Sequence, residues 1–151
     1  MIKVNVKISS KFWYKKIRNP KKYLDKKLRR ISKIVKFFNK KNVTFSILLT
    51  DSIYMKKLNK KFRKCDNATD VLSFPYFTLK NLKLIKEEKI YIGDIATSFE
   101  IIDLRSKKND FFLEFDKVWI HGLLHLIGYN HINNKDYFKM NRIEKRILKL
   151  I

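Results

Sequence analysis

Residues 112–131 read FLEFDKVWIHGLLHLIGYNH, and this stretch decides both the core and the chemistry of the chain. If its first part forms a helix, apolar side chains lie on nearly every side of that helix. They are Leu113, Val118, Trp119, Ile120, Leu123, Leu124 and Leu126. A helix without a polar face is buried in its domain. We therefore expect Phe112–Ile127 to form a buried and rigid helix in the C-terminal half of the chain.

All three histidines of the chain, His121, His125 and His131, lie in this stretch. Residues four apart share one face of a helix, so His121 and His125 can bind the same ion. Gly128 can end the helix with a positive φ, and the reversed chain can then bring His131 back. Imidazole is the commonest protein ligand for zinc, so the spacing predicts one Zn²⁺ at the end of the helix, with a fourth position open to water.

Two alternatives bear on this metal site. His121 and His125 could be ordinary core residues and His131 a surface residue, but the spacing around Gly128 favours metal binding. The spacing also equals that of the zinc-protease motif H-E-x-x-H-x-x-G-x-x-H, except that Gly122 stands where the protease has Glu. That glutamate is the general base of the peptidase reaction, so a peptidase would need a replacement for it.

The composition predicts one folded domain over residues 1–151. The chain is 45% hydrophobic and 14% aromatic, which is sufficient for a core. No apolar run reaches the length of a membrane span, and Met1–Ser9 alternates apolar and polar residues, unlike a signal peptide. Cys65 is the only cysteine, so no internal disulfide can form. We expect a cytoplasmic protein without a membrane partner.

The charge balance favours a polyanionic partner. Lys and Arg number 36 against 14 Asp and Glu, a formal charge of +22, and nucleic acid is the leading candidate. An AT-rich genome explains part of this excess, because Ala occurs only at Ala68 and Ala96, but it does not explain the scarcity of acidic residues. An anionic membrane surface is the weaker alternative, because the basic residues are spread over several elements.

The periodicity of the remaining chain predicts a small α+β domain, a mixed sheet of about four strands covered by helices on one or both faces. One helix is expected to follow Asn19-Pro20 and to continue as far as Phe38, and a second to begin at Asp51 with Met55, Leu58 and Phe62 inward. Two further helices should cover Phe99–Lys107 and Asn134–Leu150, the last with Leu150 inward. The expected strands are 2–8, 43–49, 71–77 and 90–96. Because Pro75 cannot donate to a ladder, 71–77 should lie at a sheet edge or bend there. Thr78–Lys89 should be an exposed connection without a chemical role.

Three segments together resemble the YbeY family of bacterial endoribonucleases, which are rRNA maturation factors. They are Leu58-Asn-Lys-Lys-Phe-Arg63, Thr69-Asp-Val-Leu-Ser-Phe-Pro75, and Gly93-Asp-Ile95 followed by the histidine motif. The resemblance implies that His121, His125 and His131 are zinc ligands and that Arg63 is functionally required. The family usually has Asp before the last histidine, where this chain has Asn130, so the resemblance supports no carboxylate role there.

The resemblance also implies a function and partners. The expected activity is zinc-dependent, single-strand-specific endoribonuclease cleavage in 16S rRNA 3′ end processing and ribosome quality control. The expected partners are rRNA and the small ribosomal subunit, including a small-subunit ribosomal protein and an Era-like GTPase. The alternative is a ribosome-assembly factor that binds RNA without cleaving it and in which zinc only stabilises the fold; a fourth protein ligand would favour that alternative.

Other residues are candidates for the same site. A guanidinium at Arg63 can bind two phosphate oxygens as charge develops during cleavage, although without the resemblance it would be a solvated surface residue. Asp70 and Asp94 could orient a histidine or a water, or could be a turn cap and a strand-end carboxylate. A further group of aromatic residues could stack on unpaired bases or belong to the core: Tyr76, Phe77, Tyr91 and Tyr129.

Overall fold

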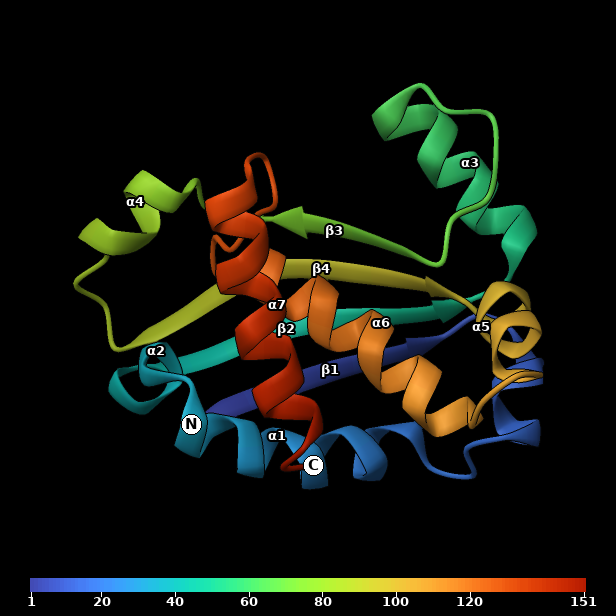
Figure 1. Cartoon of the computed structure of the whole chain (residues 1–151), viewed down its shortest axis with the longest axis horizontal. Coiled ribbons are helices and arrows are strands. Elements are labelled where there is room, and N and C mark those ends of the chain that lie inside the picture. The colour runs from blue at the N-terminus through green and yellow to red at the C-terminus, as the bar shows by residue number, and fades with distance from the viewer.

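The computed structural model describes the backbone of residues 1–151 and all side chains except those of residues 39, 40, 79 and 83. Four strands and the helices around them form the predicted α+β fold (Figure 1). In chain order the elements are β1 (Ile2–Ile8), the 3-10 helix η1 (Lys11–Lys15), α1 (Pro20–Ile34), α2 (Lys36–Lys40), β2 (Asn42–Thr50), α3 (Ser52–Arg63), β3 (Val71–Pro75), α4 (Leu79–Leu84), β4 (Lys89–Ser98), α5 (Phe99–Ser106), α6 (Phe111–Leu126) and α7 (Asn134–Leu148).

The sheet has the strand order β1-β2-β4-β3. The β1–β2 and β2–β4 pairs are parallel, and β3 pairs with β4 in the antiparallel direction. β3 therefore lies at an edge, as Pro75 predicts, because proline has no N–H for a second neighbour. A β-bulge sets Ile92 and Gly93 of β4 opposite the single residue Phe45 of β2, which changes the face on which the following residues of β4 lie.

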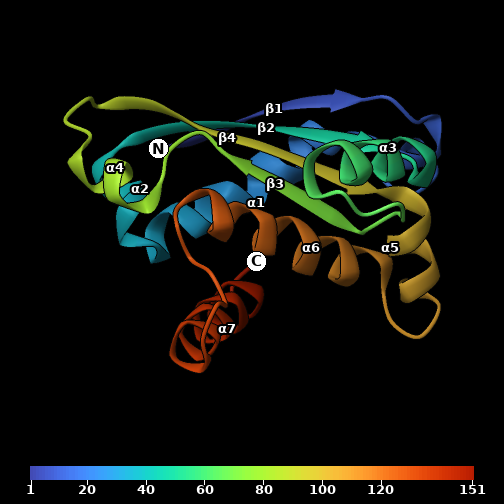
Figure 2. The same cartoon turned by 90° about the horizontal axis from the view of Figure 1, so that it is seen from above.

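The two faces of the sheet are covered unequally. α1 packs on β1, and α6 packs on β3 and β4 over the main hydrophobic core, with α7 on the outer side of α6 (Figure 2). On the other face, Met55 of α3 packs against Leu72 and Ala96. None of the helices described by the structure has the length and apolar character that a membrane crossing requires.

A largely buried ion pair joins α6 to α1. The carboxylate of Asp116, only 5% exposed, pairs with Lys27 and accepts hydrogen bonds from Tyr23 Oη and Trp119 Nε1, each at 2.9 Å. Burial, followed by the charge of Asp116, raises the pKa of Tyr23, so its hydroxyl keeps the proton that it donates. The cluster holds the helix that carries the first two histidines against the rest of the fold.

Four details of the sequence prediction were wrong. The expected helix as far as Phe38 breaks at Val35, where the extended backbone lets the chain turn toward β2. The connection 78–89 contains α4, whose Leu82 is buried in the core. Phe62 is 54% exposed and meets Phe74 edge-on, and Leu150, expected inward, is 50% exposed because α7 ends at Leu148.

Candidate metal centre and phosphate-binding pocket

His121 and His125 occupy one face of the last two turns of α6. The helix begins where Asp110 accepts a hydrogen bond from the N–H of Leu113, a regular N-cap. The four-residue spacing brings the Nε2 atoms of the two imidazoles to 3.0 Å from each other. The two rings therefore direct one nitrogen each toward the same point in space.

Gly128 turns the chain so that His131 completes the group. Its φ is +87°, a conformation that favours glycine, as the spacing predicts. The ring centroid of His131 lies 5.5 Å from that of His121 and 5.1 Å from that of His125. One nitrogen from each of the three rings lies within 4.8 Å of the others, an arrangement that can hold a metal ion.

The outer nitrogens of two of these rings are fixed by hydrogen bonds. His121 Nδ1 is 2.6 Å from Oε1 of Glu144 on α7, and His125 Nδ1 is 2.9 Å from the carbonyl oxygen of Tyr129. If each Nδ1 donates its proton, each Nε2 keeps a lone pair for a metal. The sequence did not point to Glu144, because its only signal there is an isolated carboxylate on a Lys- and Arg-rich helix.

Burial and the neighbouring imidazole of His121 lower the pKa of His125 to about 4. His125 is therefore neutral at physiological pH, which is the form of imidazole that binds metals.

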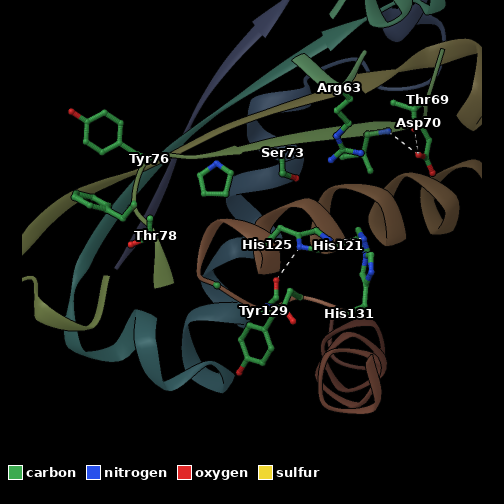
Figure 3. A pocket seen from close by; sticks show the side chains of 15 residues that line it. Arg63, Thr69, Asp70, Ser73, Tyr76, Thr78, His121, His125, Tyr129 and His131 are labelled. Carbon is green, nitrogen blue, oxygen red and sulfur yellow. Dashed lines mark hydrogen bonds between the residues drawn. The ribbon is translucent and has the colours of Figure 1, made fainter. Parts of the chain in front are cut away.

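The three histidines form one side of a pocket of about 650 Å³, and Arg63, Asp70, Ser73 and Tyr76 are among the residues of the other side. Arg63, the last residue of α3, reaches into the pocket from the side opposite the histidines (Figure 3). Among the described residues, none forms a salt bridge or a hydrogen bond with its guanidinium. Arg63 is thus available for an anion that enters the pocket.

The two candidate aspartates have different positions. Asp70 lines the pocket, but its carboxylate pairs with Arg105 and accepts a hydrogen bond from the N–H of Val71, and no hydrogen bond joins it to one of the three histidines. Asp94 accepts a hydrogen bond from Tyr91 Oη at 2.6 Å. Its neighbour Ile95 faces α6, so Asp94 points from the opposite face of the sheet.

Two further positions bear on the ligand set. Gly122 lies under β3: a Cβ atom there would come within 3.1–3.2 Å of Ile95, Ser73 and Val71. Little room remains for the glutamate that a zinc peptidase carries at this position.

The side-chain oxygen of Asn130, Oδ1, is buried without a hydrogen-bond partner among the described residues, and Asn130 lines the pocket beside His131.

Comparisons with known proteins cover almost the whole chain. A family described as Endoribonuclease YbeY matches residues 7–151. An endoribonuclease YbeY of Pelagibacter ubique is 40% identical and aligns with 100% of this chain and 97% of its own length, and one of a Wolbachia strain is 34% identical over 98% and 93%. The solution structure of TM1509 from Thermotoga maritima matches with a TM-score of 0.62 at 27% identity, covering 99% of this chain and 87% of that chain.

Proposed function

Because this chain belongs to the YbeY endoribonuclease family, we propose that it is a zinc-dependent endoribonuclease that cleaves single-stranded rRNA. Its role would be 16S rRNA 3′ end processing and ribosome quality control, performed by a single hydrolase domain over residues 1–151. The observation that carries this proposal is the convergence of three imidazoles opposite the guanidinium of Arg63, which has no partner among the described residues.

The donor set fits zinc. His121, His125 and His131 would hold the ion, since borderline-soft zinc accepts imidazole nitrogen at catalytic sites with three protein ligands. Among the side chains that the structure describes, no cysteine or carboxylate joins the three histidines as a fourth ligand, which favours an enzyme over an assembly factor with a structural zinc. When bound, zinc would act as a Lewis acid and lower the pKa of a water ligand.

Other residues would orient the metal ligands, bind the phosphate and attract the RNA. Glu144 and the carbonyl of Tyr129 orient the imidazoles of His121 and His125. Arg63 binds the scissile phosphate from the other side of the pocket and stabilises the charge that builds on its oxygens. The formal charge of +22 attracts RNA to the protein surface.

Metal content and cleavage measured on the same preparations test the proposal. We expect about one zinc per wild-type chain, loss of zinc and of cleavage in His125→Ala, and retention of both in a Lys57→Ala control on the exposed side of α3. The substrate is an rRNA fragment containing the 16S 3′ end, alone or annealed to its complement, and only the single-stranded form should be cut. Equal zinc in His125→Ala and wild type would exclude the metal site, and RNA binding without cleavage would favour the assembly factor.

A further inference from the structure

Tyr76 is the most exposed aromatic residue that lines the histidine pocket among the described residues. It directly follows β3, and 71% of it is accessible to solvent. In Figure 3 it lies across the pocket from the histidines, with its hydroxyl turned away from them. An exposed tyrosine alone is ordinary, but one beside a candidate phosphate-binding pocket offers an aromatic face where the bases of RNA would pass.

The backbone of Tyr76 is held firmly at the sheet edge. Its N–H donates to the carbonyl of Ile92 at 2.9 Å. Gly93 lies beside it with a φ of +133°, and a Cβ atom at this position would be 2.2 Å from Phe74 O and 3.0 Å from Tyr76 N. Only glycine permits this close approach of the two strands. The backbone of Tyr76 is therefore anchored to β4 directly after the end of β3.

Its two aromatic neighbours hold the ring without stacking on it. Phe77 meets Tyr76 with centroids 5.0 Å apart and ring planes at 79°, and Tyr91 meets it at 6.3 Å and 75°. Both arrangements are edge-to-face. Because no described ring stacks in parallel on Tyr76 and 71% of the residue is exposed, the ring is accessible to a further flat, aromatic group.

We propose that Tyr76 is a stacking platform for one unpaired base of an RNA strand whose phosphate faces Arg63. A base inside a duplex is covered on both faces by its neighbours, so only an unstacked base can lie on the ring. The platform gives the pocket a physical means of preferring single strands without reading their sequence, because every base has a π face. This inference rests on the proposed function, since it identifies the substrate group that the same pocket holds.

The test separates base stacking from charge. Fluorescence anisotropy measures the affinity of the protein for a cleavage-resistant 2′-O-methyl hexaadenylate and for a hexamer of the same charge without bases. Tyr76→Ala should weaken binding of the first about 5- to 150-fold and leave the second unchanged. Tyr76→Trp should restore the affinity, and Tyr14→Ala, which removes another exposed tyrosine (53% accessible), should change neither affinity.

Three outcomes would overturn the inference. They are an unchanged affinity of Tyr76→Ala for the hexaadenylate, an equal loss for both oligomers, and a failure of Tyr76→Trp to recover binding. Thermal unfolding of each variant shows whether its fold is intact. Cleavage of single-stranded RNA by the wild type is measured separately, so that the platform can fail while the nuclease assignment stands, or the reverse.

Discussion

Removal of Glu144 should weaken metal binding without disturbing the three ligands themselves. Its carboxylate lies 2.6 Å from His121 Nδ1, and the side chains of His121 and Glu144 are 32% and 21% exposed. A hydrogen bond to a charged group contributes about 1.5–3 kcal/mol, and partial exposure places this one near the lower end. Because about 1.4 kcal/mol is a factor of ten in Kd, we expect Glu144→Ala to raise the zinc Kd about 10-fold, and at most about 100-fold.

Glu144→Gln should cause a smaller loss, because the amide oxygen can still accept the proton of Nδ1 while the negative charge is gone. Competition against a chromophoric zinc chelator at fixed pH gives the Kd of each variant. Asp136→Asn is the matched control: it removes the same charge from the same helix, where Asp136 bonds with Asn133 and not with a histidine. A folded Glu144→Ala protein whose zinc Kd stays within about twofold of the wild type would refute the reasoning.

Three further predictions concern the phosphate contact, the charge and the core. Arg63→Ala should keep its zinc and most of its RNA affinity, but its single-turnover cleavage rate should fall about 10²–10³-fold, with little recovery in Arg63→Lys. The control Lys57→Ala should cleave at the wild-type rate. An Arg63→Ala enzyme that also cleaves at the wild-type rate would remove Arg63 from the mechanism. The logarithm of the affinity for single-stranded RNA should fall linearly with the logarithm of the salt concentration, with a slope of about −0.7 per phosphate contacted, and a flat response would contradict electrostatic binding. Asp116→Ala should lower the free energy of unfolding by about 3 kcal/mol, the lower end for breaking a buried pair, because it leaves Lys27, whose side chain is only 16% exposed, without its partner. Asp25→Ala at an exposed pair should cost at most about 1 kcal/mol. Similar urea midpoints for the two variants would count against a stabilising role of the Asp116 pair.

The sequence predicted best what depends on neighbouring residues. The apolar helix, the pairing of His121 with His125 and the turn at Gly128 all follow from spacing within one segment. Because Gly128 is one of only three glycines in the chain, its position was informative. Pro75 predicted that β3 lies at a sheet edge or bends there, and the edge position is confirmed.

Features that depend on tertiary contacts were missed or left open. Nothing near Glu144 in the sequence indicates that α7 lies across the end of α6, so its contact with His121 could not be derived. The face on which Asp94 lies depends on the bulge opposite Phe45, which alternation along the strand does not reveal. For Tyr76 the sequence left the stacking and core roles open, and the structure shows an exposed ring.

The three imidazoles come from eleven consecutive residues, so they can assemble on a short loop whose closure costs little chain entropy. The partner of His121 lies 23 residues further along, and Arg63 belongs to a helix on the other side of the sheet. The histidine side of the pocket therefore depends mainly on contacts that are local in sequence, whereas the Arg63 side depends on contacts between distant segments, which form more slowly in folding. Binding of a metal by the three histidines alone would therefore not assemble the proposed site, which also needs the folded sheet that positions Arg63.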